Sequence, residues 1–343
     1  MVSRVKVGDI AREAGVSSAT VDRVLNDRDG VSARTREIVR GTARRLGYLP
    51  GSDQPDAPVR SGTVHEFVFL LPAGTNTFIK TLGRQIEAQA ATREMIRVRV
   101  ETFEGFNPQL LAARIAALPA TVAGVGLIAQ DHPLIRDAIR ALVRRGCEVL
   151  TLASDIQNVP RLAYVGIDNR AAGRLAGHLM GKLLGQRPAA KVALFAGSMS
   201  YRGHEEREMG FRAVLREDFP MVQIVDTREI LDDRQTAQHE ATQVLAQHPD
   251  ILGIYNVGGG TFGIAEAIKA KGARERLVLI GHEATAGNKQ LLLDGLLDAV
   301  IDQNPRVEAR EALNILTAAA EKQPYVFVPP RIQVVFKENL PED

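Results

Sequence analysis

Nine apolar runs of strand length alternate with helical segments between residues 65 and 303, and this alternation most limits the possible folds. Most of the runs are continuously apolar rather than apolar at every second residue, as expected of strands that are covered on both faces. The pattern predicts an α/β fold in which helices cover both faces of parallel sheets. The runs are HEFVFLLP, IRVRVETFE, GVGLIA, CEVLTLAS, KVALFAGS, VQIVDTRE, ILGIYNV, LVLIGHE and LLDAVIDQ.

Polar side chains follow most of these predicted strands. Parallel sheets bind ligands at the carboxyl ends of their strands, so these residues are the first candidates for a binding site. Amides, carboxylates and an aromatic ring together suit a neutral, polyhydroxylated ligand. The strand-end residues are Asn76, Phe78, Gln130, Asp131, Ser154, Asp155, the run YRGHE (201–205), Asn256, His282, Glu283, Gln303 and Asn304.

The segment VGDIAREAGVSSATVDRVLN (7–26) predicts two short helices joined by a tight turn. Gly15 ends the first helix where a left-handed backbone is needed, and Ser17 is a good N-cap for the second. This spacing is that of a helix-turn-helix. The apolar faces are formed by Val7, Ile10, Ala11 and Ala14 in the first helix, and by Val21, Val24 and Leu25 in the second.

A third helix is predicted from about Ser32 to Leu46, with Thr35, Ile38, Thr42 and Leu46 facing inward. Residues 1–50 contain ten basic and six acidic residues, whereas the rest of the chain contains 33 basic and 35 acidic ones. A basic head on a slightly acidic body suits the binding of phosphates by the head.

The sequence VKVGDIAREAGVSSATVDRVLN, followed by VSARTREIVRGTARRLGYLP, resembles the DNA-binding head of the lactose-repressor (LacI) family. The resemblance implies that the second helix enters the major groove. It assigns base contacts to Ser18, Ala19 and Arg23, where Arg23 can bind guanine bidentately. It assigns phosphate positioning to Ser17, Thr20 and Asn26. Asp22 departs from the small hydroxyl residue usual there, and is expected either to orient Arg23 or to accept from a cytosine.

The segment GSDQPDAPVRSG (51–62) differs from the hinge helix that the family generally carries at this place. Pro55 and Pro58 oppose a regular helix, so a flexible linker is expected. The predicted organisation is therefore a DNA-binding domain at 1–50, a linker at 51–62 and an effector-binding domain at 63–343.

Residues 63–335 resemble the periplasmic sugar-binding protein fold that the same family uses as its sensor. The resemblance implies two lobes joined by three crossovers, with lobe 1 at about 63–165 and 296–323 and lobe 2 at about 166–295 and 324–340. The effector is then a sugar, a polyol or a sugar acid. The effector-binding candidates are Asn76, Phe78, Asp131, Ser154, Asp155, Arg202, Glu205, Asn256, His282, Glu283 and Gln303.

Two positions depart from the family pattern, since Glu205 stands where sugar binders often carry arginine and Gly258 where they often carry asparagine. Two candidates also have a plainer interpretation. Phe78 fits the hydrophobic core as well as a ligand stack, and His282 fits a buried, hydrogen-bonded histidine.

The segment GGGTFG (258–263) supports a competing function. It matches G-x-G-x-x-G after a strand and before a helix, as in an NAD(P)-dependent oxidoreductase. It comes late in the chain, however, and no other catalytic motif accompanies it. We therefore expect a repressor without enzymatic activity, metal or cofactor, which binds a pseudo-palindromic operator as a homodimer or a tetramer.

The sequence has one cysteine, Cys147, which begins a predicted strand and is expected to be buried. The first residues lack the apolar run of a signal peptide, and no stretch of 18 apolar residues occurs. These features predict a cytoplasmic protein that does not interact with membranes.

Overall fold

The computed structural model describes residues 6–26, 28, 30–46, 48, 63–185, 189–274 and 277–341. The chain divides into two units, Met1–Val64 and His65–Asp343, which are described separately below. The predicted linker at 51–62 lies outside the described residues.

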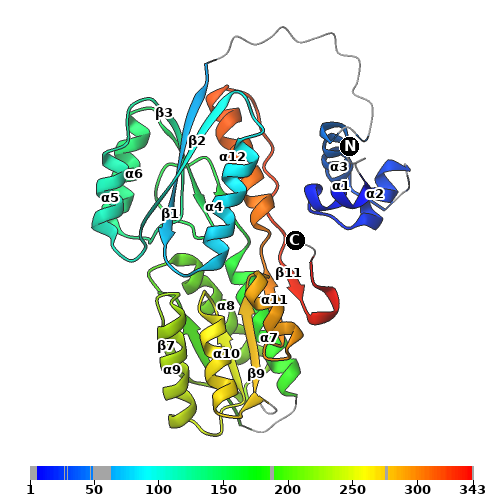
Figure 1. Cartoon of the computed structure of the whole chain (residues 1–343), viewed down its shortest axis with the longest axis vertical. Helices are drawn as coiled ribbons and strands as arrows, with labels where there is room; N and C mark the ends of the chain where they lie inside the picture. Colours follow the sequence, from blue (N-terminus) through cyan, green and yellow to red (C-terminus); the bar gives the residue numbers. More distant parts are fainter. Residues whose placement is uncertain are drawn as a thin grey trace. The chain divides into compact units, whose positions relative to one another are not determined.

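The described part of the first unit contains three helices: α1 (Val7–Ala14), α2 (Ser18–Leu25) and α3 (Ala33–Arg45) (Figure 1). Gly15 ends α1 in the left-handed conformation, with φ of 65°, and the Ser17 hydroxyl accepts a hydrogen bond from the Thr20 amide at 3.1 Å. Both local predictions for the helix-turn-helix are thereby confirmed. The buried core of the unit is Ile10, Ala11, Ala14, Val21, Val24, Val39 and Ala43.

The inner face of α3 is rotated relative to the prediction. Val39, Thr42 and Ala43 are buried, whereas the expected Thr35, Ile38 and Leu46 are only partly buried. Val39 completes the core because it lies one turn before Ala43 on the face that meets α1 and α2.

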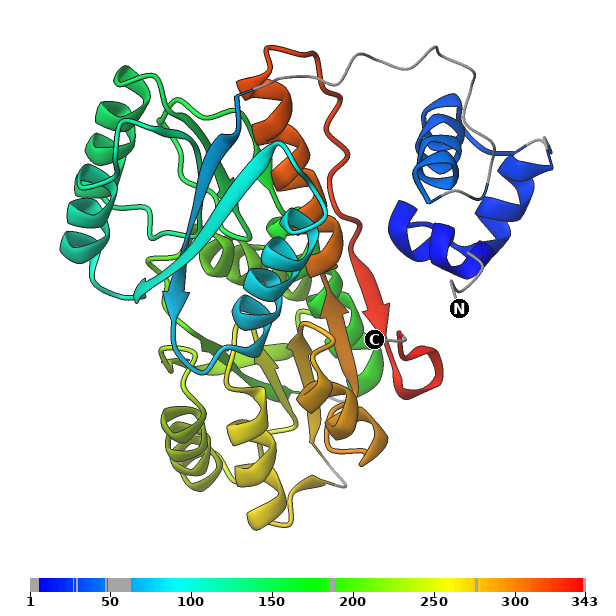
Figure 2. The ribbon, with the colours of Figure 1, turned by 45° about the horizontal axis from the view of Figure 1, so that its top comes forward.

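The first sheet of the large unit has five parallel strands in the order β2-β1-β3-β4-β5. Alternate residues of β1 pack on opposite faces: Phe67 and Phe69 contact the core under α4 and α12, and Val68 and Leu70 contact the core under α5 and α6. Figure 2 shows α12 beside α4 on one face. The elements are β1 (His65–Ala73), β2 (Ile96–Glu104), β3 (Val122–Leu127), β4 (Glu148–Leu152), β5 (Tyr164–Val165), α4 (Thr77–Ala90), α5 (Pro108–Ala116), α6 (Pro133–Arg144) and α12 (Pro305–Ala320).

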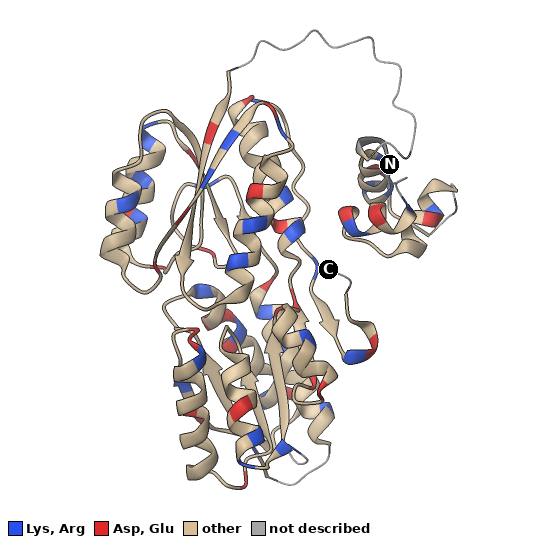
Figure 3. Cartoon of the chain, viewed as in Figure 1, with Lys and Arg blue, Asp and Glu red and all other residues tan. Residues whose placement is uncertain are grey.

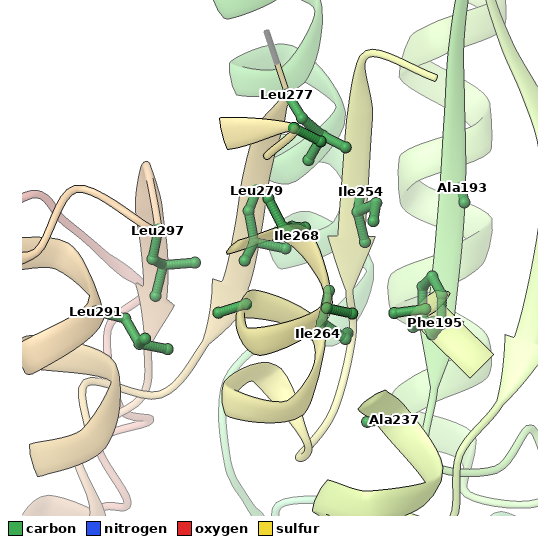
Figure 4. Close-up of a cluster of buried hydrophobic side chains, with 14 of the residues drawn as sticks. Ala193, Phe195, Ala237, Ile254, Ile264, Ile268, Leu277, Leu279, Leu291 and Leu297 are labelled. Atoms are coloured by element: carbon green, nitrogen blue, oxygen red, sulfur yellow. The ribbon is translucent and has the colours of Figure 1, made fainter. Parts of the chain in front are cut away.

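The second sheet has six strands in the order β11-β10-β9-β8-β6-β7, and only the pairing of β11 with β10 is antiparallel. Phe195, Ile254 and Leu279 pack beneath α9 and α10 on one face (Figure 4). The elements are β6 (Ala190–Ala196), β7 (Val222–Glu229), β8 (Gly253–Asn256), β9 (Val278–His282), β10 (Ala299–Asp302), β11 (Gln333–Val335), α7 (Asn169–Leu184), α8 (Arg202–Asp218), α9 (Arg234–Gln247), α10 (Thr261–Ala270), α11 (Ala286–Leu293) and a short 3₁₀ helix, Lys337–Asn339.

Close packing of α7 against α8 on the other face depends on glycine. A Cβ atom at Gly173 would lie 1.9 Å from the backbone oxygen of Arg207, so any side chain at this position would push the helices apart. Figure 3 shows acidic and basic positions mixed along the helices of the large unit.

All nine predicted strands are present, and the α/β class with parallel sheets is confirmed. The short strands β5 and β11 were not predicted, because two or three residues give too little pattern. The lobe boundaries also differ from the expectation. Since β10 pairs with β9, the second crossing between lobes comes at residues 303–304, after β10, rather than before residue 296.

Candidate functional site

A cavity of about 70 Å³ lies between the two lobes of the large unit, where the carboxyl ends of both sheets meet. Aromatic residues form one part of its wall. The ring of Phe106 meets that of Tyr201 edge-on at 5.7 Å, and the Tyr201 hydroxyl donates to the backbone oxygen of Gly105. Five predicted residues line the cavity, namely Asn76, Phe78, Ser154, Glu283 and Gln303.

Arg207 of α8 also lines this cavity, and its side chain is almost fully buried. Its Nε atom donates to Asn169 Oδ1 at 2.8 Å, and its Nη1 atom donates to the backbone oxygen of Val257 at 2.7 Å. Nη1 also lies 3.4 Å from Glu283 Oε1. The cavity therefore contains a fixed, buried ion pair with one side facing any bound molecule.

This arginine was not predicted; Glu205, which was expected to occupy the corresponding position, is exposed on α8. Two residues along a helix is about 200° around its axis, so Glu205 and Arg207 lie on opposite faces. The spacing of Gly203, Arg207, Gly210 and Phe211, all buried, is the signal that could have identified Arg207.

Glu283 is held in an environment that disfavours its charge. Burial raises the pKa of its carboxyl group to about 7, while the nearby Arg207 guanidinium opposes that rise. Gln303 Nε2 donates to Glu283 Oε1 at 3.0 Å. Glu308 of α12 is completely buried, and neither of its carboxylate oxygens has a hydrogen-bond partner among the described residues. Burial raises the pKa of Glu308 well above its usual value.

Asp232, which was also missed, connects the two lobes. Its Oδ2 atom accepts from Asn76 Nδ2 at 3.1 Å, and its backbone oxygen accepts from the Thr75 hydroxyl at 2.9 Å. Its Oδ1 atom accepts from the Gly259 amide at 2.7 Å. Asp232 belongs to no periodic pattern in the sequence, because it lies in an irregular turn after β7.

This contact explains the glycine run of GGGTFG. A Cβ atom at Gly258 would lie 2.5 Å from Asp232 Oδ1, so the carboxylate can approach the loop only because this position has no side chain. A dinucleotide fingerprint offers its loop amides to a pyrophosphate. Here the Gly259 amide already binds a carboxylate of the chain itself.

His204 lines the cavity beside Asp232. Its Nδ1 atom lies 3.1 Å from the backbone oxygen of Ser198. Burial lowers the pKa of His204, so the imidazole is neutral at pH 7. The cavity thus contains one histidine that can hydrogen-bond without adding charge.

The carboxylates of Asp131 and Asp155 are not among the described groups that line this cavity. Asp131 forms an ion pair with Arg136 at 2.6 Å. Asp155 accepts from the Thr151 hydroxyl at 2.7 Å and pairs with Arg161. Both form ion pairs with arginines of their own lobe, so the structure does not bring them together with the five residues above, and their contact with an effector stays a prediction.

Three further candidates have structural roles within the second lobe. Arg202 pairs with Glu206 at 2.8 Å, one turn along α8. Asn256 Nδ2 donates to the backbone oxygens of Gly258 and Gly259, at 3.0 and 2.8 Å, and so shapes the glycine loop. None of the three lines the 70 Å³ cavity in the described part of the chain. The third, His282, is buried with its Nε2 atom 2.7 Å from the Tyr255 hydroxyl, as its plainer interpretation predicted.

In the first unit, α2 exposes most of the side chains assigned to DNA. Ser17, Ser18, Ala19, Arg23 and Asn26 are exposed, and Thr20 is half-buried. Asp22 accepts from Asn26 Nδ2 at 2.8 Å and pairs with Arg28 at 3.3 Å. The carboxylate is therefore directed along the helix toward its C-terminus.

Within the described residues, no helix combines the length and the apolar character needed to cross a membrane. Cys147 is buried, and this burial raises the pKa of its thiol to about 12.

Comparison with known proteins assigns both units. Residues 6–51 match the family described as bacterial regulatory proteins, lacI family, and residues 67–324 match the periplasmic binding protein domain. The ribose operon repressor of Halalkalibacterium halodurans is 28% identical over 254 residues, which cover 73% of this chain and 70% of that protein. The sucrose operon repressor of Vibrio alginolyticus is 41% identical over 92 residues, which cover 27% of this chain and 95% of that sequence.

Solved structures share the fold of the large unit. GanP, a glucose-galactose binding protein from Geobacillus stearothermophilus, has a TM-score of 0.74 and 22% identity, and the match covers 82% of this chain and all of that one. A solute-binding protein of an ABC transporter from Agrobacterium vitis, with bound D-fucose, has a TM-score of 0.75 and 21% identity. That match covers 80% of this chain and 96% of the other.

Proposed function

Because the chain belongs to the lacI family of bacterial regulatory proteins, we propose that a small polyhydroxylated effector in the cavity controls its affinity for an operator. The chain is a transcription regulator on this family assignment, and its relatives include the ribose and sucrose operon repressors named above. We further propose that it represses transcription in the cytoplasm and has no enzymatic activity.

The observation that carries the effector assignment is the buried group formed by Arg207, Glu283 and Gln303. It presents donors and acceptors in fixed positions, and the aromatic rings of Phe78 and Tyr201 lie on the wall of the same cavity. Such a combination binds hydroxyl groups on one side of a sugar and its C–H surface on the other. Since Arg207 is already paired with Glu283, an uncharged sugar or polyol fits this group better than a sugar acid.

For DNA, we propose that two chains form a homodimer that places each α2 in a major groove of a pseudo-palindromic operator. Arg23 then binds guanine, Ser18 and Ala19 contact base edges, and Ser17, Thr20 and Asn26 lie near phosphates. Effector binding alters the relation of the two lobes, which Asp232 and Asn76 join, and so the spacing of the heads. A coupling free energy of about 1–3 kcal/mol is typical of such regulation.

The test is thermal melting of the purified full chain with sugars, polyols, sugar acids and nicotinamide dinucleotides. A ligand at about 100 times its Kd stabilises by about 2.7 kcal/mol, a rise in Tm of several degrees. We expect a rise with a sugar or polyol, which is lost in Gln303→Ala and kept in the matched surface variant Arg202→Ala. A rise with a dinucleotide alone would contradict the proposal.

A further inference from the structure

A second cavity, of about 360 Å³, adjoins the one described above. We call it the outer chamber, and the 70 Å³ cavity the inner chamber. Thr75, Asn76, Gly258 and Glu283 line both chambers, so the two meet at these residues. Sites for small molecules usually enclose about 300–1,000 Å³, so the inner chamber alone is small and the outer one falls in the usual range.

The partition between the chambers is the hydrogen-bonded bridge from Asn76 through Asp232 to Gly259. Asn76 lines both chambers, Asp232 lines the inner one and Gly259 the outer one. The bridge consists of two hydrogen bonds to one carboxylate. The two chambers also share Thr75, Gly258 and Glu283, so they adjoin beside this bridge.

The outer chamber contains an aromatic ring in a fixed orientation. Phe262 is 36% exposed, and the guanidinium carbon of Arg234 lies 4.1 Å from the centre of its ring. Arg234 is itself held by two hydrogen bonds to Glu266, at 2.9 and 3.1 Å. A ring fixed in this way offers a flat apolar surface at little cost in side-chain entropy.

The polar groups of the outer chamber suit an uncharged ligand. Its described charged lining residues are already paired, Arg234 with Glu266 and Glu283 with Arg207. The remaining polar lining consists of hydroxyl and amide groups and the imidazole of His282, whose pKa is lowered by burial. The hydroxyl and amide groups come from Thr75, Asn76, Thr77, Thr261, Thr285 and Asn288. Hydroxyl groups beside a fixed aromatic ring are complementary to a second sugar ring.

We propose that the outer chamber binds a second part of the effector, so that the effector is an elongated neutral glycoside or disaccharide rather than a free monosaccharide. One ring lies in the inner chamber, and the other lies against Phe262 and the bare loop at Gly258–Gly260. This inference rests on the proposed function and specifies the ligand of the same cleft.

Gly287 permits a test that leaves the inner chamber intact. It lies in the first turn of α11, lines only the outer chamber and is exposed, and an ideal Cβ there has no atom within 4 Å. Gly287→Phe therefore adds an aromatic side chain to the lining of the outer chamber without a clash at its Cβ atom. Ala286→Phe is the matched control, since Ala286 is exposed on the same turn and lines neither described chamber.

The measurement is calorimetric titration of the full chain with monosaccharides and with disaccharides built from them, such as galactose with lactose and melibiose, or glucose with cellobiose and sucrose. We expect at least one disaccharide to bind ten-fold or more tightly than either of its components. Gly287→Phe should remove that advantage and leave monosaccharide affinity within two-fold, while Ala286→Phe should change neither.

A monosaccharide that binds as tightly as every disaccharide, with no effect of Gly287→Phe, overturns the inference but leaves the proposed function in place. Failure of every sugar and polyol to bind removes both. If Gly287→Phe loses its cooperative melting transition, Phe262→Ala replaces it, because Phe262 is partly exposed. That variant should weaken disaccharide binding alone, and equal affinity to the parent chain would overturn the inference.

Discussion

Replacing Glu283 by glutamine should change how the stability of the effector-free protein depends on pH. Folding buries this carboxyl group and raises its pKa from 4.5 to about 7, so the folded state binds the proton more tightly than the unfolded state. The stability associated with the protonated group is fully present below pH 4.5. It is lost as the pH rises through 7.

The size of the loss follows from the two pKa values. At about 1.4 kcal/mol for each pKa unit, ionisation of Glu283 lowers the free energy of unfolding by about 3 kcal/mol between pH 4.5 and pH 8. The difference between Glu283→Gln and the parent chain reports this contribution together with the charge repulsion between Glu283 and Glu308. The variant should therefore gain about 3 kcal/mol relative to the parent across this range.

Urea unfolding of the full chain at a series of pH values, monitored by far-UV circular dichroism, measures this difference. A constant offset between the two curves is acceptable, since glutamine alters the contact with Arg207 at every pH. Two curves that stay parallel from pH 4.5 to pH 8 would refute the reasoning. Glu205→Gln is the control, because it removes an exposed carboxylate from the same region and should give parallel curves.

Three further predictions concern single side chains. Arg23→Ala should weaken operator binding, measured by fluorescence anisotropy, by about 1–3 kcal/mol, and should leave Tm unchanged. Unchanged operator affinity would reject α2 as the helix that contacts the bases. Glu308→Leu should raise the free energy of unfolding by about 1–3 kcal/mol, because a buried carboxyl group without partners among the described residues is replaced by an apolar one. Gly15→Ala should destabilise the first unit by about 1–2 kcal/mol, because Gly15 has φ of 65°; hydrogen exchange of α1 and α2 amides checks this.

Much of the fold could be predicted from the sequence because its signals are local. Most strands are continuous apolar runs, whereas β2 and β7 carry charged residues among apolar ones. The turn of the head depends on Gly15 and the Ser17 cap, which lie next to the helices they affect. The boundary between the lobes could not be read this way. Whether β10 joins the first or the second sheet depends on its pairing with β9. The sequence of an apolar run does not specify which strand it pairs with.

The site was predictable only in part, for the same reason. Asn76, Ser154 and Glu283 lie within three residues of the ends of β1, β4 and β9, so their position in the cleft follows from the topology of a parallel sheet. Arg207 lies within a helix, and its position depends on which face of α8 packs against α7. Asp232 lies in an irregular turn, and its contacts with Asn76 and Gly259 join residues that are far apart in the chain.

The backbone around the inner chamber indicates that this cleft is shaped for a ligand. Among the described residues, seven non-glycine residues have positive φ, and four of them line the inner chamber. Each such conformation costs about 1–3 kcal/mol and persists only where the surrounding structure holds it. Here the hydrogen bonds of Asp232 and the burial of Glu283 hold the backbone in this conformation. Both carboxyl groups then face the space between the lobes. The four residues are Ala153, Leu231, Asp232 and Glu283. A cleft that merely remained between two packed lobes would not concentrate strained residues at its wall, so their clustering supports binding as the role of this cavity.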